Sequence, residues 1–144
     1  MTTIITDITD NDLLKYYWLP LCYKHQEFDF IFTDGSGINL AIKDKPKNTR
    51  FYKCDRKFGI WNARGEPVFL TNQNSIPTYE TMVYMQNLKT DVCIRPKYLN
   101  GENSECFSIH KYWYIEPEDP VQTVEEYINK YGPKVIEDLT LYNV

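Results

Sequence analysis

Residues 28–32 are Phe28-Asp29-Phe30-Ile31-Phe32, a stretch with phenylalanine at every second position. A period of two is the pattern of a β-strand, because successive side chains point to opposite faces of a sheet. The turn signal Asp34-Gly35-Ser36-Gly37 follows, and Ile38-Asn39-Leu40-Ala41-Ile42 has the composition of a returning strand. The stretch therefore predicts a β-hairpin with one aromatic face.

Strand patterns also fill the middle of the chain. We expect strands at residues 50–54, 58–61, 67–70, 91–95 and 106–115, with 58–61 and 67–70 joined as a hairpin. The connections between these strands are mostly too short for the helical crossovers that parallel strands need. We therefore predict an α+β fold whose aromatic-rich sheet is mainly antiparallel.

A short helix is expected near the N-terminus. Leucine and aromatic residues recur at helical spacing between Leu13 and Leu21. Thr9 or Asp10 would cap this helix, because a side-chain oxygen there can accept from the first free backbone N–H groups. Pro20 is expected to disrupt the helix, since proline has no backbone N–H.

Further helices are expected later in the chain. Residues 79–88 fit either a strand or a helix, and we favour a helix capped by Thr78. The firmest helix pattern runs from a cap at Asp119 to Gly132, where glycine ends the helix. A second short C-terminal helix is expected over residues 135–139.

Length and composition favour one soluble domain. The chain has 144 residues, of which 15% are aromatic, and this is enough for a single domain over residues 1–144 with one hydrophobic core. No apolar stretch reaches the ~18 residues that span a bilayer, and the first residues lack the features of a secretory signal. The four cysteines show no disulfide framework spacing. We therefore expect a cytoplasmic protein with reduced thiols.

One short string suggests nuclease chemistry. Phe32-Thr33-Asp34-Gly35-Ser36, after a hydrophobic strand, resembles the first catalytic strand of the ribonuclease H family. The resemblance implies that Asp34 holds a metal ion that activates water for phosphodiester cleavage, with Glu80 and Asp91 as further acidic positions. Two-metal catalysis needs several carboxylates that converge. Asp-Gly is also the standard signal of a hairpin turn, so both interpretations stay open.

Cysteine and histidine occur as two close pairs, Cys22 with His25 and Cys106 with His110. A zinc ion takes four such ligands at ~2.0–2.3 Å. If residues 106–110 form a strand, the second pair is ~13 Å apart and cannot share one ion. We therefore expect the cysteines to be small core residues, and we expect no metal ion and no cofactor.

Basic residues and aromatic rings alternate over residues 43–61. The candidates for contact with phosphates or bases are Arg50, Tyr52, Lys53, Arg56, Lys57 and Trp61. Cations gain affinity for nucleic acid by releasing counterions, while rings stack on bases. A strand with one solvated basic face explains the same pattern. The net charge of −4 argues against a dedicated nucleic-acid binder, so nucleic-acid or nucleotide-phosphate binding is an alternative that we do not favour.

Acidic and aromatic residues mark the C-terminal part of the chain. The candidates for contact with a protein partner are Tyr112, Tyr114, Glu125, Glu126, Glu137 and Asp138. Tyrosine is enriched at protein interfaces, and acidic surface steers basic partners. Burial of the tyrosines in a central strand and solvation of the acidic residues on a helix are the alternatives.

The acids, thiols and imidazoles form no pattern specific enough for an enzyme. Residue types with AT-rich codons are abundant and alanine occurs only at Ala41 and Ala63, which indicates an AT-rich genome such as those of many phages, viruses and some bacteria. We therefore expect a non-catalytic binding protein in the host cytoplasm. It would inhibit or adapt a host protein through an acidic surface rich in tyrosine and tryptophan.

Overall fold

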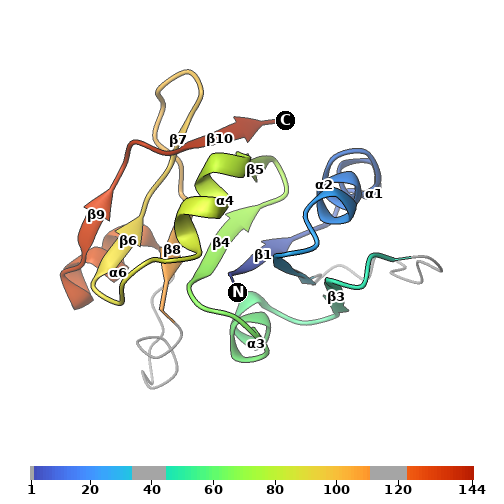
Figure 1. The fold of residues 1–144 in the computed structure, drawn as a ribbon, viewed down its shortest axis with the longest axis horizontal. Helices are drawn as coiled ribbons and strands as arrows, with labels where there is room; N and C mark the ends of the chain where they lie inside the picture. The colour runs from blue at the N-terminus through green and yellow to red at the C-terminus, as the bar shows by residue number, and fades with distance from the viewer. Residues whose placement is uncertain (1, 34–44, 111–122) are drawn as a thin grey trace.

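The computed structural model describes residues 2–33, 45–110 and 123–144 (Figure 1). Several predictions from the sequence fall outside these residues. They are the returning strand at 38–42, the metal ligand Asp34, the partner-binding residues Tyr112 and Tyr114, and the helix cap Asp119.

Five strands form the main sheet in the order β3-β2-β1-β4-β8. Their bounds are Thr3–Asp7 (β1), Asp29–Thr33 (β2), Thr49–Tyr52 (β3), Val68–Asn72 (β4) and Phe107–Ile109 (β8). β1 pairs in parallel with β2 and with β4, and β2 pairs in parallel with β3. Among the described strands of this sheet, β8 alone is antiparallel to its neighbour. The α+β class is confirmed, but the mainly antiparallel sheet is wrong, because this sheet is largely parallel.

The error follows from the central strand β1, for which the sequence predicts no strand. Ile4 and Ile5 are adjacent and fully buried, one on each face of the sheet, so the stretch has no alternation. With β1 in place, the helical residues 11–24 become the crossover that returns the chain to a parallel strand. The alternating stretch around Phe30 is confirmed as β2.

The first crossover consists of α1 (Asn11–Leu13), a π-helical turn η1 (Leu14–Trp18) and α2 (Leu19–Lys24). Asp10 is confirmed as the cap, since its carboxylate accepts from the N–H of Asp12 at 2.9 Å. Next to Pro20 the α-helical hydrogen bonding is disrupted, but the helix does not end there. The N–H of Leu19 donates to Leu14 O, five residues back, and this wide turn accommodates the proline ring.

Helix α3 (Arg56–Trp61) occupies residues for which a strand at 58–61 is predicted, so that prediction and its hairpin are wrong. Asp55 caps the helix by accepting from Phe58 N at 3.1 Å. Gly59 allows the helix to lie directly on the sheet, because a Cβ there would be only 3.1 Å from Cγ2 of Thr33 and 3.3 Å from Cγ2 of Ile31. The run Phe58–Trp61 is too short to show a helical period.

The later elements surround this sheet. Their bounds are Ser75–Pro77 (β5), Tyr79–Met85 (α4), Val92–Ile94 (β6), Lys97–Tyr98 (β7), Val124–Tyr131 (α6), Lys134–Ile136 (β9) and Thr140–Asn143 (β10). The predicted helix α4 with its Thr78 cap is confirmed, as is the end of α6 at Gly132, which has φ 57°. The predicted start of α6 is wrong, because Thr123 is extended and caps the helix by accepting from Glu126 N at 3.2 Å. The short helix predicted at 135–139 is wrong: β9 pairs with β6, and β10 pairs with β5 and β7.

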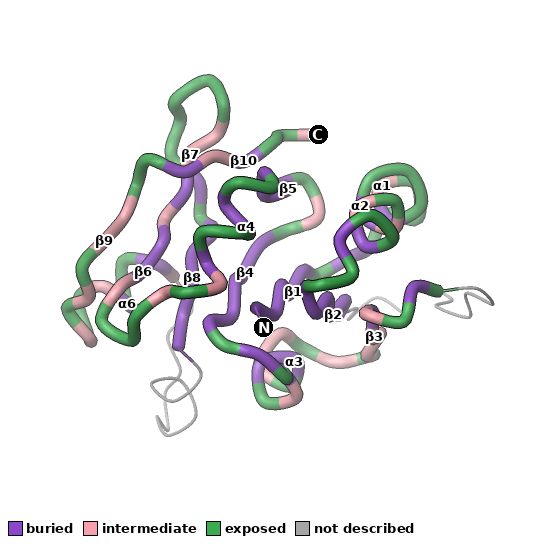
Figure 2. The backbone as a smooth tube through the Cα atoms, in the orientation of Figure 1, coloured by how far each residue is buried: buried purple, intermediate pink, exposed green. Residues whose placement is uncertain are grey.

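The strands of the main sheet are mostly buried (Figure 2), and one hydrophobic cluster covers each face of the sheet. On one face, Ile4, Phe30 and Phe32 pack with residues of α1 to α2, α4, β5 and β10. On the other face, Ile5 and Ile31 pack with residues of α3 and α6. The sheet is therefore sandwiched between two layers, which explains why its strands are buried on both sides. Among the described residues, no helix is long and apolar enough to cross a membrane.

Candidate functional site

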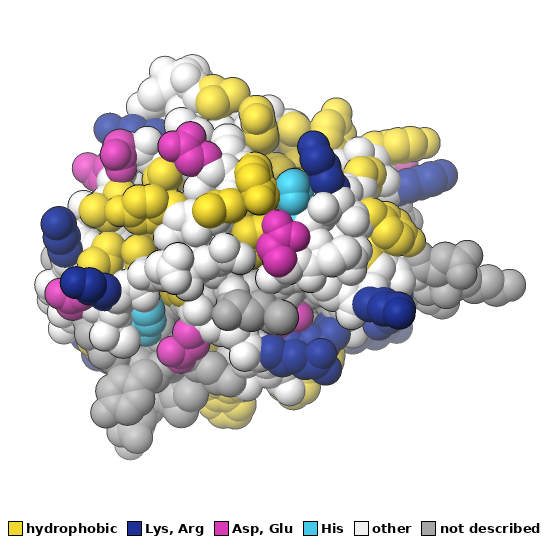
Figure 3. Space-filling view, in the orientation of Figure 1, with side chains coloured by type: hydrophobic (Ala, Val, Ile, Leu, Met, Phe, Trp, Pro, Cys, Tyr) yellow, Lys and Arg dark blue, Asp and Glu magenta, His cyan; other side chains and the backbone are white. Residues whose placement is uncertain are grey.

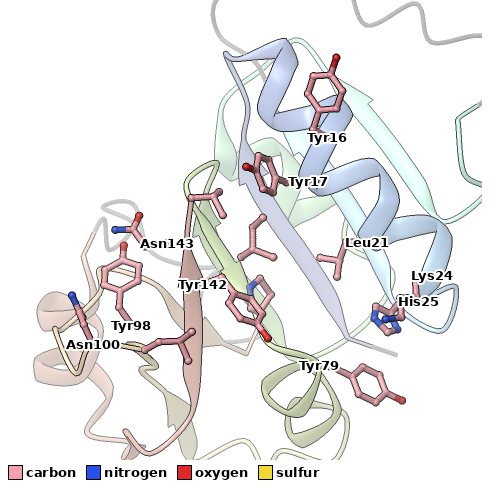
Figure 4. A pocket seen from close by; sticks show the side chains of 14 residues that line it. Tyr16, Tyr17, Leu21, Lys24, His25, Tyr79, Tyr98, Asn100, Tyr142 and Asn143 are labelled. Carbon is pink, nitrogen blue, oxygen red and sulfur yellow. The ribbon is translucent and has the colours of Figure 1, made fainter.

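A groove of about 660 Å³ opens on the side of the molecule that carries α1 to α2, α4 and β10 (Figure 4). Five of its lining residues are tyrosines, and we call it the tyrosine groove. The residues that line it are Tyr16, Tyr17, Leu21, Lys24, His25, Ile76, Pro77, Tyr79, Tyr98, Leu99, Asn100, Tyr142, Asn143 and Val144.

The groove lies between a helix and a strand. Tyr17, Leu21 and Lys24 are four and three residues apart, so they follow one side of the first crossover helix. Tyr142 of β10 faces them across the groove, whereas Asn143 points to the other side of the strand, next to Tyr98. Ile76 and Pro77 of β5 are buried and form its base. Residues from four separate parts of the chain therefore build one concave surface.

The tyrosine rings are unusually accessible. Tyr16, Tyr17, Tyr79 and Tyr142 are 63%, 47%, 54% and 48% exposed. In Figure 3 hydrophobic side chains gather over α2, α4 and β10, the elements that border the groove. Contiguous exposed apolar patches often mark binding surfaces, whereas single exposed apolar residues are common on any protein. Sequence analysis missed these tyrosines, because no local pattern joins residues so far apart in the chain.

One end of the groove is held in a fixed arrangement. The rings of His25 and Tyr79 are stacked, with centroids 4.7 Å apart and an interplanar angle of 15°. Nδ1 of His25 lies 3.7 Å from the carboxylate of Glu27. The carbonyl of His25 accepts from Asn48 Nδ2 at 3.0 Å, which ties the end of the helix to the start of β3. Tyr79 is therefore presented to solvent by a rigid support.

The lining of the groove includes a cationic side chain but no carboxylate. Lys24 is its one lysine or arginine, and none of the lining residues described is aspartate or glutamate. The hydroxyl of Tyr98 is hydrogen-bonded to Ser75 Oγ at 2.7 Å, so this ring is also fixed. A chain with a net charge of −4 thus presents a groove that favours neutral or anionic groups.

The basic and aromatic candidates divide into two groups. Arg50 is structural: its guanidinium lies 2.6 Å from the buried carboxylate of Asp29 and donates to Asn62 O at 2.6 Å. The structure brings the others together around α3, with Phe58 as an addition. We call this surface the α3 patch, and its residues are Tyr52, Lys53, Arg56, Lys57, Phe58 and Trp61.

The acidic candidates lie away from the tyrosine groove. Glu125 of α6 pairs with Arg95 at 2.7 Å, and Glu126 is its exposed neighbour. Glu137 and Asp138 are exposed in the connection between β9 and β10. None of the four lines the groove, so the structure does not combine acidic and tyrosine residues there.

The nuclease candidates are not brought together within the described residues. Glu80 is in the first turn of α4, next to Tyr79, whose ring stacks on His25 near the amino end of β2. Thr33, which precedes Asp34, is at the opposite end of that strand. Asp91 is exposed just before β6.

The sequence analysis also missed Asp7, an exposed carboxylate at the end of β1 that accepts a hydrogen bond from Thr33 Oγ1. Ligands of open parallel sheets bind at this edge. Asp7 supplies one carboxylate there, whereas a two-metal site needs several.

The cysteines behave as core residues, as predicted, for Cys22, Cys93 and Cys106, which are all buried. Burial raises the pKa of the Cys93 thiol to about 12 and also raises the pKa of Cys22. Cys106 is hydrogen-bonded to Thr71 Oγ1 at 3.3 Å, and His110 Nε2 to Lys89 O at 2.8 Å, so the two side chains have separate partners. No group of three or more His, Cys, Asp or Glu that could hold a metal ion occurs among the described residues.

Comparison of the chain with models of protein families and with curated proteins gives no match. Function is therefore inferred from the geometry of the tyrosine groove and of the α3 patch.

Proposed function

We propose that this chain is a non-catalytic binding protein that holds an extended segment of a partner protein in the tyrosine groove. The observation that carries the proposal is a concave surface of about 660 Å³ lined by five tyrosines and no acidic residue. The AT-rich codon composition fits a phage or viral inhibitor or adaptor that acts on a host protein.

Tyrosine suits this role for a physical reason. Its ring buries a large apolar area but has few torsions to immobilise, and its hydroxyl can still donate a hydrogen bond. Tyr79 and Tyr98 are already fixed by His25 and Ser75, so a ligand loses little further side-chain entropy when it packs on them. Interfaces of this type derive most of their affinity from a few such rings.

The occupant that fits is a proline-rich segment in the polyproline II conformation. Aromatic-lined grooves bind such segments because the ligand is extended before binding and leaves its carbonyls free. Tyrosine hydroxyls and the amides of Asn100 and Asn143 can donate to those carbonyls. Lys24 at the His25 end favours an acidic residue in the segment.

The proposed binding surface does not include the acidic residues near the C-terminus. Glu125, Glu126, Glu137 and Asp138 then serve as solvated charges, and Glu125 also pairs with Arg95. Reversing both Glu137 and Asp138 to lysine is expected to leave peptide affinity within about twofold. A larger loss of peptide affinity would show that these acidic residues belong to the partner-binding surface.

The test is fluorescence anisotropy with a short labelled peptide rich in proline and glutamate. We expect Tyr79→Ala to weaken binding by about tenfold or more, the usual cost of removing an aromatic anchor. Tyr84→Ala is the matched control, because Tyr84 is on the same helix, is 48% exposed and does not line the groove.

Two further peptides complete the design. Replacing the prolines by alanine, or the glutamates by lysine, is expected to weaken binding. Equal losses for Tyr79→Ala and Tyr84→Ala, or no binding of the proline- and glutamate-rich peptide, would overturn the proposal.

A further inference from the structure

The α3 patch is a second surface, which the proposed peptide binding does not use. Gly59 and Ile60 are buried against the sheet, whereas Phe58 and Trp61 of the same helix are exposed. Phe58 and Trp61 are 44% and 50% exposed, although large aromatic residues are normally buried. The helix therefore carries two aromatic rings on its solvent side.

Neighbouring side chains position these rings. The ring of Tyr52, at the end of β3, packs edge to face on the ring of Phe58, and the two centroids are 5.2 Å apart. Nζ of Lys57 lies over the ring of Trp61, 5.2 Å from its centroid. Rings that are held in place lose less entropy when they stack on a flat ligand.

The local charge is positive. Residues 53–64 include one acidic residue, Asp55, and the basic residues Lys53, Arg56, Lys57 and Arg64. The Asp55 carboxylate caps α3 and accepts from Phe58 N at 3.1 Å. Lys53 is exposed, and Arg56 and Lys57 are half-buried. The segment that carries the two exposed rings is thus basic, in a chain that is acidic overall.

We infer that the α3 patch binds single-stranded nucleic acid. Phe58 and Trp61 stack on bases, and Lys53, Arg56 and Lys57 contact the phosphates. Every base has a flat face, so exposed rings accept any sequence, while nearby cations follow the backbone. Duplex DNA keeps its bases stacked inside the helix and offers the rings nothing to stack on. The patch therefore distinguishes single strands from duplexes.

The test is fluorescence anisotropy of labelled oligo-dT with the full chain at several salt concentrations. We expect Trp61→Ala to weaken binding by about tenfold, the typical effect of losing one stacking partner. Trp61→Phe should restore most of the affinity, because a flat ring is restored. Lys57→Glu should weaken binding and reduce the dependence of log Kd on log salt concentration.

Lys130→Glu is the matched control for charge. Nζ of Lys130 lies 5.5 Å from the centroid of the Tyr131 ring, so this pair on α6 has the same chemistry as Lys57 and Trp61. We expect Lys130→Glu to leave oligo-dT binding unchanged. Each variant is compared with the parent chain by thermal unfolding, so that a folding defect is recognised.

Three results would overturn the inference. They are equal affinity for duplex and single-stranded DNA, affinity that does not change with salt, and equal losses for Lys57→Glu and Lys130→Glu. The oligo-dT test is independent of the peptide proposal. Tyr79 is on the other side of the sheet, so Tyr79→Ala should leave oligo-dT binding intact.

Discussion

The two sides of the main sheet both expose aromatic rings, but they do so in different surroundings. On one side, several elements cover the sheet, and the tyrosine groove forms where the first crossover helix, β5 and β10 meet. On the other side, the rings of the α3 patch stand on the outward surface of one short helix. The groove has one lysine and no acidic lining residue, whereas the patch contains three basic residues, Lys53, Arg56 and Lys57.

What an exposed aromatic residue can bind depends on the shape and charge of the surface around it. A concave, weakly charged surface can enclose an extended peptide and exclude water around it. Exposed rings beside cations can stack on bases and neutralise phosphates.

The largest effect is expected for Asp29→Ala. This change leaves the half-buried Arg50 without the buried carboxylate that lies 2.6 Å away, and should lower the free energy of unfolding by about 3 kcal/mol. Glu125→Ala, at the more exposed pair with Arg95, should cost about 1 kcal/mol or less. Urea unfolding measures both. Equal costs would mean that Arg50 is not a core residue and could belong to the α3 patch.

Gly59→Ala should have the next largest effect. The added Cβ would lie 3.1 Å from Cγ2 of Thr33, so α3 has to shift on the sheet, at a cost of about 1–3 kcal/mol. Because α3 carries Phe58 and Trp61, oligo-dT binding should weaken while peptide binding is unchanged. A loss of both would show that the two sides of the sheet are coupled.

Alkaline pH should destabilise both layers. Burial raises the pKa of Cys93 to about 12, and also that of Cys22 in the layer beneath the groove. A thiol with a raised pKa in the folded state keeps its proton, so its stabilising effect is complete below the unfolded pKa and is lost as pH rises towards the folded value.

Above about pH 9 each such thiol should therefore remove about 1.4 kcal/mol per pH unit. Urea unfolding of the parent chain and of Cys93→Ala at pH 8 to 10 measures the slope. The slope should be smaller for Cys93→Ala. Identical slopes would contradict the burial of this thiol.

A smaller effect is expected for Lys24→Glu. The lysine lies at the edge of the groove, so reversing its charge should weaken binding of the glutamate-bearing peptide by about fivefold, mainly through a slower association rate. Oligo-dT binding should change little, because Lys24 is on the opposite side of the sheet. Stopped-flow mixing at low and high salt measures the rate. An unchanged association rate would show that Lys24 does not contact the peptide.

The sequence predicts the elements that have a clear local signal. The alternating phenylalanines indicate β2, Thr78 indicates the start of α4, and Gly132 indicates the end of α6. The central strand β1 has no such signal, because Ile4 and Ile5 are buried on opposite faces. Without β1 the first helix cannot be recognised as a crossover, and the parallel pairing of the sheet cannot be predicted.

The two binding surfaces differ in the same way. Most of the α3 patch comes from one continuous segment, so its basic and aromatic residues are visible in the sequence even though the segment folds as a helix and not as a strand. The tyrosine groove joins residues 16–25, 76–79, 98–100 and 142–144. Such a surface exists only once the chain has folded, and its tyrosines look like ordinary exposed residues beforehand.

The central claim is that these two surfaces bind different partners independently. It is tested most directly by measuring the Kd of the proline- and glutamate-rich peptide for the parent chain, Tyr79→Ala and Trp61→Ala. Our account predicts a loss of about tenfold or more for Tyr79→Ala and a change within about twofold for Trp61→Ala. An equal loss for both variants, or a loss for Trp61→Ala alone, would contradict it.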